Sequence, residues 1–273
     1  MVPFLVWDHS PFIYTSDFIS IRYYSVLFAA GLLFLLFRLI KDLSLNMDKE
    51  FIESSFFSLV FFMLLGSRIF HCLFYEYGYY STNLLEILIP FRLSPLHFTG
   101  YQGLSSHGGF LGAALYLFLF FRKKVSPIIF FKFLDSILLN SLIFASLVRI
   151  GNFYNSEIIG KPCLYLFCLA FPSSGYGLIP RHPVQLYEAF IYLITFLSIL
   201  FYKHRASISI GKVSLYVVTV AGIMRFSLEF FKETQSDIVL IFLNMGQFLS
   251  IVSYSIFITV FIYLYRNLNN EKN

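Results

Sequence analysis

The amino-acid sequence predicts an all-α polytopic membrane protein with seven transmembrane helices and two longer loops on the periplasmic side. Hydrophobic residues make up 58% of the 273 residues and charged residues only 13%, whereas charged residues are about 25% of an ordinary soluble domain. The mean hydropathy is +0.75. The apolar runs are long and continuous, which indicates helices, because the strands of a membrane β-barrel alternate between apolar and polar residues.

Each predicted helix is a run of apolar residues that can cross a bilayer. The hydrocarbon core is about 30 Å thick and a helix rises about 1.5 Å per residue, so roughly 20 residues cross it once. In chain order the runs are 19–40, 51–75, 107–121, 128–150, 184–202, 213–231 and 240–265. Residues 1–17 have no basic region and no small-residue cleavage site, so we expect the first helix to direct its own insertion.

The connections between the runs predict one membrane domain, residues 1–273, with extracytoplasmic loop segments at 76–106 and 152–183. Twelve lysines and arginines fall in one alternating set of connections, and four fall in the other set: Arg92, Lys161, Arg181 and Lys232. Basic residues favour the cytoplasmic side, so the N-terminus is expected outside and the C-terminus in the cytoplasm. Because the basic residues sort by membrane side, we expect no nucleic-acid partner.

Four arginines, Arg22, Arg68, Arg149 and Arg225, lie at or inside predicted helices, where a charge is costly and points to a functional site. Arg149 begins a polar stretch at the end of an apolar run, Arg149-Ile150-Gly151-Asn152-Phe153-Tyr154-Asn155-Ser156-Glu157. A guanidinium presents a planar set of donors that suits phosphate oxygens, and Arg225 supplies a second one at an equivalent depth. The pair predicts a site for a lipid phosphate.

Two further motifs lie on the same predicted side. Arg225 and Glu229 are four residues apart, so they share a helix face and can pair directly; a purely structural ion pair is the alternative. His107-Gly108-Gly109 marks the start of the third helix, where the glycines permit close approach of the backbone. A neutral imidazole there can take a proton from a thiol or hydroxyl near neutral pH, although a lone histidine is more often structural.

Other polar residues leave two interpretations open. The segment Arg181-His182-Pro183-Val184-Gln185-Leu186-Tyr187-Glu188 is typical of a helix start and can equally supply ligands. Asp135 is expected to pair within the bundle rather than act in catalysis. Arg68 can bind a phosphate or extend to the lipid headgroups.

Cysteines and histidines predict neither a cofactor nor a metal site. Cys163 and Cys168 share an outside loop, where a disulfide is permitted but not established by the sequence, and Cys72 lies in the second helix. The histidines are scattered without the spacing of metal ligands: His9, His71, His97, His107, His182 and His204.

Together these motifs resemble the bacterial phosphatidylglycerol:prolipoprotein diacylglyceryl transferase family. The signature stretch of that family is similar to residues 148–157, followed by Gly160. Further matching pieces occur in the family order: Ile19-Ser20-Ile21-Arg22-Tyr23-Tyr24, Ser105-Ser106-His107-Gly108-Gly109, the segment from Arg181 to Glu188, and Arg225-Phe226 through Glu229-Phe230-Phe231 to Glu233. The resemblance therefore runs nearly from end to end.

The resemblance implies an enzyme of the bacterial inner membrane. It would transfer the sn-1,2-diacylglyceryl group of phosphatidylglycerol to the lipobox cysteine thiol of a prolipoprotein signal peptide, form a thioether and release glycerol phosphate. The implied catalytic residues are Tyr24, His107, Arg149, Arg225 and Glu229. The implied substrate-binding residues are Gly108, Arg149, Asn152, Glu157, His182, Gln185 and Arg225. Arg149 and Arg225 would hold the phosphate, and His107 would activate the thiol.

Some positions depart from the family pattern. Val148, Ser67 and Ser156 stand where glycines are common, and a serine can replace glycine where φ stays negative. Ala221 stands where a tyrosine is often found, which removes a possible headgroup contact or base that Tyr24 or Tyr187 would have to supply.

Two other functions fit the same charged residues. A non-catalytic membrane protein can use the arginines to bind a phospholipid headgroup or conduct an anion. A different transferase acting on lipid-linked substrates fits the chemistry equally well from physical argument alone. Product analysis with a lipobox peptide discriminates these, because a binder or channel leaves both substrates unchanged.

Overall fold

A computed structural model describes residues 5–16, 20–89, 91–93, 96–98, 103–165, 167–205, 208–233, 239–240 and 243–270 of the chain. These residues form two compact units. The first contains Met1–Asp42 and Phe131–Asn273, and the second contains Leu43–Phe130. The charged residues of the 149–157 stretch and of the Arg225 segment belong to the first unit, and His107 belongs to the second.

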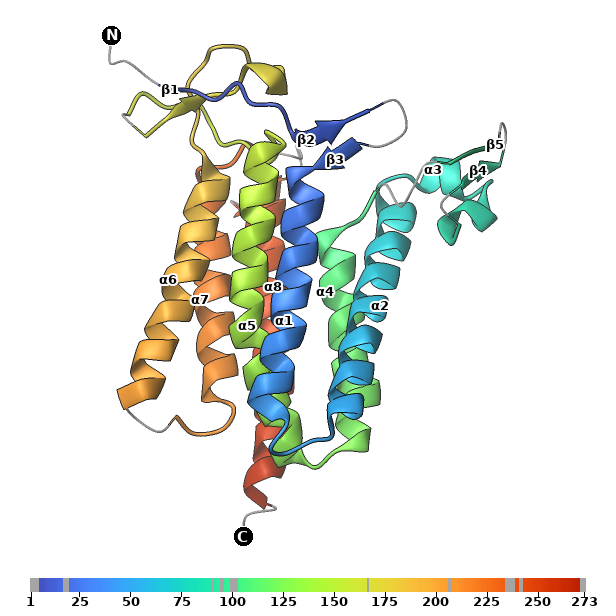
Figure 1. Ribbon diagram of the computed structural model, residues 1–273, viewed down its shortest axis with the longest axis vertical. Coiled ribbons are helices and arrows are strands. Elements are labelled where there is room, and N and C mark those ends of the chain that lie inside the picture. The colour runs from blue at the N-terminus through green and yellow to red at the C-terminus, as the bar shows by residue number, and fades with distance from the viewer. Residues whose placement is uncertain are drawn as a thin grey trace. The chain divides into compact units, whose positions relative to one another are not determined.

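The first unit is a bundle of long helices whose axes run side by side (Figure 1). Its helices are α1 (Tyr23–Leu43), α5 (Pro127–Tyr154), α6 (Val184–Arg205), α7 (Lys212–Leu228) and α8 (Met245–Asn270). Apolar side chains of α5, α6 and α7 form a core of Leu139, Leu142, Phe196, Ile199, Val213 and Val217. This packing fixes the three helices whose ends carry the charged residues.

Short strands and a loop cover one end of this bundle (Figure 1). The strands are β1 (Leu5–Val6), β2 (Phe12–Thr15), β3 (Ser20–Arg22), β6 (Leu169–Ala170), β7 (Val239–Leu240) and β8 (Leu243–Asn244), with a 3₁₀ turn η4 (Pro172–Ser174). β1 pairs in parallel with β6, and the Trp7 ring that follows packs 4.3 Å from the ring of Phe153 near the end of α5. The sequence predicts residues 20–22 as the start of the first helix. In the structure they instead form strand β3, which pairs antiparallel with β2.

The second unit is built on two helices in close contact. α2 (Lys49–Phe74) packs against α4 (Ser106–Leu115), which continues as the π-helical turn η2 (Tyr116–Phe121) and the 3₁₀ turn η3 (Arg122–Lys124). Gly66 of α2 faces the backbone of Gly108 and Gly112 of α4, where added Cβ atoms would clash. Small residues of this kind let membrane helices approach closely. The unit also contains α3 (Tyr77–Tyr80), η1 (Leu84–Ile87), β4 (Phe91–Leu93) and β5 (Leu96–Phe98).

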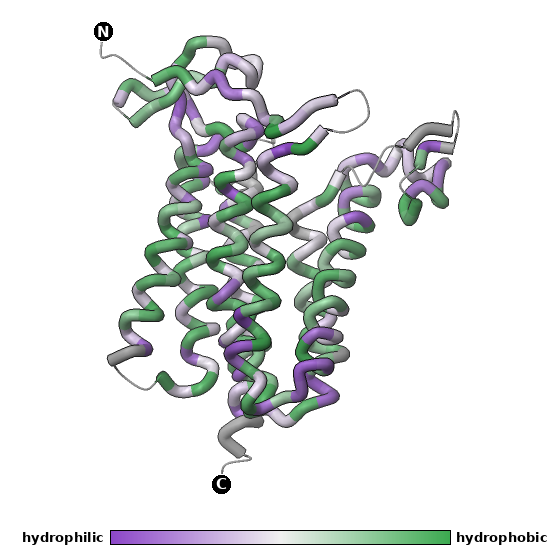
Figure 2. The backbone as a smooth tube through the Cα atoms, in the orientation of Figure 1, coloured by the Kyte–Doolittle hydropathy of each residue, from purple (hydrophilic) through white to green (hydrophobic). Residues whose placement is uncertain are grey.

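The helices are those of a membrane protein. Among the described residues, five helical segments are long and apolar enough to cross a bilayer: Tyr23–Leu43, Lys49–Phe74, Pro127–Tyr154, Val184–Lys203 and Gly246–Arg266. In each unit, apolar residues follow the middle of the helices and polar residues gather toward their ends (Figure 2). The third and sixth predicted helices correspond to α4 with η2 and to α7, which are shorter.

Buried polar contacts join the helices at the end opposite to β1 and β6. Asp135 of α5 accepts hydrogen bonds from the backbone N–H groups of Gly211 and Ser214 at 2.7 and 2.8 Å, and from Ser214 Oγ at 2.5 Å. It thus caps the start of α7, which agrees with the expectation that it pairs within the bundle. Asp42 likewise accepts hydrogen bonds from Ser136 and Asn140.

Candidate active site

A buried ion cluster joins α5, α6 and the end of α7. Glu188 of α6, whose side chain is 1% exposed, pairs with Arg149 Nε through one oxygen and with Lys232 Nζ, at 2.7 Å, through the other. Lys232 also lies 3.7 Å from Glu229 Oε2. Burial lowers the pKa of Lys232, and the adjacent Glu188 carboxylate opposes that shift. A buried carboxylate between two cations holds both at fixed positions, because either cation alone would be costly to bury.

Arg225 belongs to the same cluster but not through the expected partner. It lies in the last turn of α7 and interacts electrostatically with both Glu188 and Lys232. No ion pair within 4.0 Å joins Arg225 to Glu229 in the described structure, so the predicted direct pairing is wrong. Glu229 is the C-cap residue of α7, and it turns instead toward Lys232 and toward Gly246 of α8, where a Cβ would collide with its carboxylate.

Amide side chains extend the cluster from Arg149 to Glu157. The helix α5 continues through Tyr154, so Arg149 Nη1 can donate to Asn152 Oδ1 at 3.2 Å. Asn152 Nδ2 in turn donates to Glu157 Oε2 at 3.0 Å, and Asn155 Nδ2 donates to Glu157 Oε1 at 3.2 Å. Gln185, fully buried at the start of α6, donates to the main-chain oxygen of Glu157.

The backbone around Glu157 adopts an unusual conformation. Ser156 has φ of 52° and Ile158 has φ of 57°, in the left-handed region that costs a non-glycine residue about 1–2 kcal/mol. The condition under which a serine replaces glycine without strain, a negative φ, is therefore not met at Ser156. The turn therefore holds Glu157 between two strained residues, and such strain tends to gather at functional sites.

Tyr24, in the first turn of α1, packs against the same stretch of α5. Its backbone and ring lie against Gly151, where a Cβ would stand 2.8 Å from Tyr24 Cδ2 and 3.1 Å from Tyr24 Cα. Its hydroxyl interacts electrostatically with both Glu157 and Arg149. The glycine of the 149–157 stretch thus permits the close approach that brings Tyr24 to the site.

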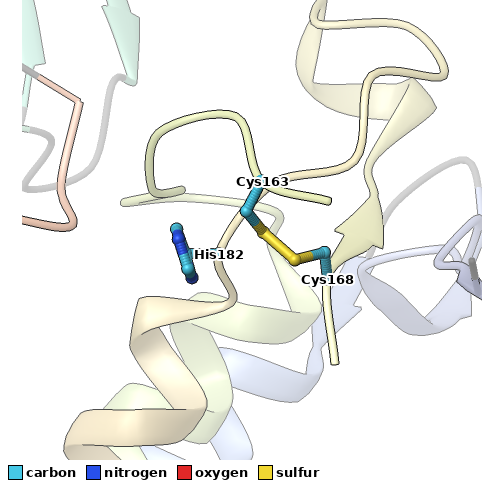
Figure 3. A group of neighbouring side chains, drawn as sticks. All are labelled: Cys163, Cys168 and His182. Atoms are coloured by element: carbon cyan, nitrogen blue, oxygen red, sulfur yellow. A yellow bond between two sulfur atoms is a disulfide. The ribbon is translucent and has the colours of Figure 1, made fainter. Parts of the chain in front are cut away.

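A disulfide-bridged loop holds the segment that precedes α6. Cys163 and Cys168 are bonded, with their Cα atoms 6.0 Å apart, and His182 lies beside the bridge (Figure 3). Cys163 N donates to Pro180 O at 2.9 Å, and Leu169 exchanges two backbone hydrogen bonds with Arg181. Although the two sulfurs and a ring nitrogen of His182 lie within 4.8 Å of one another, the bridged sulfurs offer no thiolate to a metal ion.

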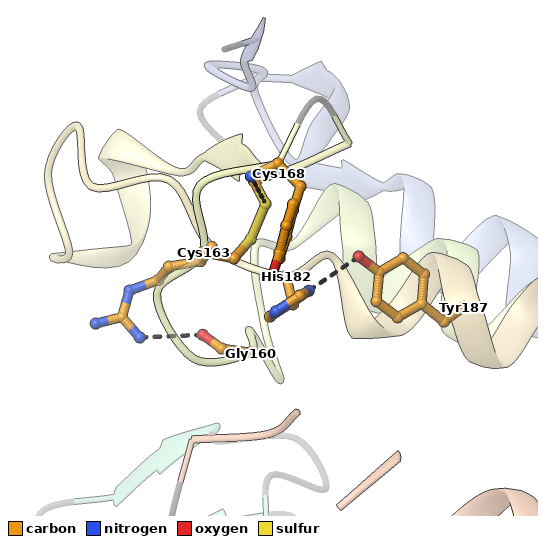
Figure 4. The surroundings of a disulfide bond; sticks show 7 residues. Gly160, Cys163, Cys168, His182 and Tyr187 are labelled. Atoms are coloured by element: carbon orange, nitrogen blue, oxygen red, sulfur yellow. Dashed lines mark hydrogen bonds between the residues drawn. A yellow bond between two sulfur atoms is a disulfide. The ribbon is translucent and has the colours of Figure 1, made fainter. Parts of the chain in front are cut away.

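His182 and Arg181 face different partners. His182 Nδ1 lies 3.2 Å from the Tyr187 hydroxyl (Figure 4), and its ring packs edge-on against Phe231. Burial lowers the pKa of His182. Arg181 Nη1 donates to Gly160 O at 3.0 Å and pairs with Glu233, which follows Lys232 in the chain. The segment thus fixes the backbone on which Lys232 is carried.

In the second unit the sequence singled out His107, Gly108 and Arg68. His107 lies in the first turn of α4, and Gly108 packs against α2 at Gly66 and Phe70. Arg68 is buried and donates to Glu86 O at 2.7 Å, to Ile87 O at 3.1 Å and to the Tyr80 hydroxyl at 3.1 Å. Its guanidinium therefore holds the turn η1 beside α2.

Comparisons with known proteins show which family the chain is similar to. A model of the prolipoprotein diacylglyceryl transferase family matches residues 11–263. The chain belongs to this family. Three relatives named phosphatidylglycerol–prolipoprotein diacylglyceryl transferase come from Bacteroides fragilis, Chloroherpeton thalassium and Chlamydia caviae, at 37%, 34% and 33% identity. The matches cover 90%, 91% and 90% of this chain and 90%, 90% and 88% of the respective relatives.

As a member of the prolipoprotein diacylglyceryl transferase family, the protein is a membrane transferase, and the first unit brings most of the predicted site residues together. Linked contacts and charge interactions connect Tyr24, Arg149, Asn152, Glu157, Gln185, Arg225 and Glu229. His182 lies at the edge, among Tyr187, Phe231 and the disulfide.

Sequence reasoning missed the two residues at the centre of this transferase's ion cluster. The sequence indicates Glu188 as part of a helix start and Lys232 only as a cation of a loop. A signal for Glu188 was available: it follows Gln185 by three residues on the first turns of α6 and therefore lies on the same face. Lys232 carried no such signal, because only the turn after α7 brings it back toward Glu188.

Proposed function

We propose that this protein transfers the diacylglyceryl group of phosphatidylglycerol to the thiol of a prolipoprotein lipobox cysteine, forming a thioether and releasing glycerol phosphate. The observation that carries the proposal is the cluster in which Glu188 stands between Arg149 and Lys232, with Arg225 beside them. Cations held in place before the substrate arrives suit a phosphate whose charge grows during the reaction.

The charge change follows from the bonds that form and break. The cysteine sulfur forms a bond to the glyceryl carbon that carries the phosphate oxygen, and that carbon–oxygen bond breaks. The lipid phosphodiester bears one negative charge, whereas the departing glycerol phosphate gains a second. Arg149 and Arg225 stabilise this added charge, and their fixed guanidinium planes orient the leaving oxygen.

The thiol must lose a proton in the same reaction, since a free cysteine with a pKa of about 8.5 is mostly protonated at neutral pH. We assign the role of proton acceptor to His107, at the start of α4. Tyr24 and Glu229 complete the catalytic set, and Gly108, Asn152, Glu157, His182 and Gln185 contribute to substrate binding.

We further place the protein in the bacterial inner membrane, among membrane lipids, with seven crossings. The two additional crossings are α4 with η2, and α7. The N-terminus is then outside and the C-terminus in the cytoplasm, because lysines and arginines gather in the helix ends on either side of the α1–α2 and α6–α7 turns and in η3. This orientation puts the ion cluster at the outer surface, where secreted prolipoproteins present their signal peptides.

Reconstituted transfer tests the proposal. Purified protein in phosphatidylglycerol vesicles is incubated with a lipobox peptide, and the thioether product is measured by mass spectrometry. We expect product from the wild type and a loss of at least a hundredfold in Arg149→Ala and Arg225→Ala. Lys161→Ala is the matched control, since Lys161 is an exposed cation of the 152–183 segment, and it should keep wild-type activity.

Two outcomes would contradict this function. A folded wild-type protein that leaves both substrates unchanged supports a lipid-binding or anion-conducting role instead. Equal activity in Arg149→Ala, Arg225→Ala and Lys161→Ala would remove the proposed phosphate site. Arg225→Lys gives a finer test: it retains the charge but loses the planar pair of donors, so we expect it to be impaired as well.

A further inference from the structure

Glu157 differs from the other carboxylates of the site. Its side chain is exposed, whereas Glu188 is 1% and Glu229 14% exposed. In the part of the chain that the structure describes, no cation lies within 4.0 Å of it; its two oxygens accept hydrogen bonds from Asn152 and Asn155 instead. Each carboxylate oxygen can accept more than one hydrogen bond, so Glu157 retains acceptor capacity toward a ligand.

Two further acceptors lie next to Glu157. Gln185 is fully buried and uses its amide N–H to bind the Glu157 main-chain oxygen, which leaves its Oε1 without a hydrogen-bond partner among the described residues. Asn155 Oδ1 is likewise buried without a described partner. Buried acceptors of this kind are costly unless a donor satisfies them. The neighbourhood of Glu157 is therefore suited to a ligand rich in donors.

The position of this acceptor group relative to Arg149 indicates which part of a ligand it meets. A single amide, Asn152, links the Arg149 guanidinium to the Glu157 carboxylate. A phosphate held at Arg149 would thus place its next substituent near Glu157. In phosphatidylglycerol this substituent carries two hydroxyls, and each hydroxyl can donate a hydrogen bond to such acceptors.

We propose that Glu157, with Asn155 and Gln185, recognises the two hydroxyls of the headgroup glycerol and thereby favours phosphatidylglycerol over a phospholipid whose headgroup lacks them. This inference rests on the proposed function, because it takes the phosphate to lie at Arg149. The positive φ angles of Ser156 and Ile158 support it, since the strained turn holds the carboxylate in one position. Glu157 is here a specificity-determining residue that contacts the substrate.

A comparison of two lipids tests this role directly. Transfer to a lipobox peptide is measured as kcat/KM from phosphatidylglycerol and from phosphatidylpropanol of the same acyl chains, which lacks both headgroup hydroxyls. We expect the wild type to prefer phosphatidylglycerol by tenfold or more, as for a hydrogen bond to a charged group. Glu157→Gln should lose about tenfold on phosphatidylglycerol and change less than about twofold on phosphatidylpropanol.

Two further variants separate recognition from folding. Asn155→Ala removes one hydrogen bond to the carboxylate and one acceptor, so it should give a smaller loss that is again confined to phosphatidylglycerol. Ser173→Ala, the matched control, removes a hydrogen bond to Ser156 Oγ in the same turn and should leave both lipids unaffected. Melting temperatures of all variants are measured alongside.

The outcomes distinguish this inference from the proposed function. An equal loss on both lipids in Glu157→Gln would show a structural role and overturn the inference, as would a wild type that uses both lipids equally. A wild type that transfers from neither lipid would overturn the proposed function and the inference with it.

Discussion

At the scale of single residues, Glu188 is the carboxylate that balances the charges of Arg149 and Lys232. Glu188→Gln removes the anion between Arg149 and Lys232 and leaves two largely buried cations facing each other. Removing one partner of a buried pair costs about 3–5 kcal/mol, so we expect a marked fall in melting temperature and at least a hundredfold loss of transfer. Both are measured on protein purified in detergent.

The control adds Lys232→Met to that variant. Because the second change removes an unpaired buried cation, the double variant should regain part of the lost stability without regaining activity. A Glu188→Gln protein as stable and as active as the wild type would contradict the assigned role.

The burial of His182 predicts that the stability of the protein depends on pH. The pKa of this residue is lowered in the folded protein by burial, so the unfolded chain binds more protons and stability falls as pH drops below about 6.5. We expect the melting temperature of the wild type to decrease between pH 7.5 and 5.5 by more than that of His182→Asn. Equal pH dependence of the two proteins would mean that His182 does not contribute.

At the scale of elements, Asp135 fixes the start of α7 from another helix. Asp135→Ala removes acceptors for three donors of Gly211 and Ser214, so we expect a loss of about 1–2 kcal/mol, as for a helix cap. Activity should fall as well, because α7 carries Arg225. Ser214→Ala, which removes only one of the three donors, should have a smaller effect on the melting temperature. A larger effect of Ser214→Ala would contradict the capping role.

The elements also show what the sequence could predict. Apolar runs located every long helix to within a few residues, because hydrocarbon thickness and helix rise limit where a run can begin and end. The strands β1 and β6 are 164 residues apart in their register pair Leu5 and Leu169 and carry no local signal. The same is true of Lys232, which reaches Glu188 only through tertiary folding.

Ser156 illustrates the limit of reasoning from residue type. A serine ordinarily has a negative φ, and nothing in the sequence indicates that Ser156 lies in the left-handed region, as it does in the folded turn. The Cys163–Cys168 bridge was likewise left open by the sequence, because spacing permits a disulfide without requiring one. Propensity yields to tertiary contacts at both positions.

At the scale of the whole molecule, the proposed seven crossings predict which loops face the outside. The two crossings that decide the count are α4 with η2, and α7. If α4 crosses, Leu84 is outside and Lys123 is cytoplasmic; if α7 crosses, Lys203 is cytoplasmic and Phe230 is outside. All four side chains are exposed, so a cysteine at each is accessible to a reagent. The physical basis is the preference of lysine and arginine for the cytoplasmic side.

Labelling of spheroplasts with a membrane-impermeant maleimide tests this topology. The background variant Cys72→Ser removes the free cysteine and leaves the disulfide intact. We expect Leu84→Cys and Phe230→Cys to react in intact spheroplasts, and Lys123→Cys and Lys203→Cys to react only after permeabilisation. Reaction of Lys123→Cys in intact spheroplasts would mean that α4 and η2 do not cross, and His107 would then have to reach the outer surface from a re-entrant segment.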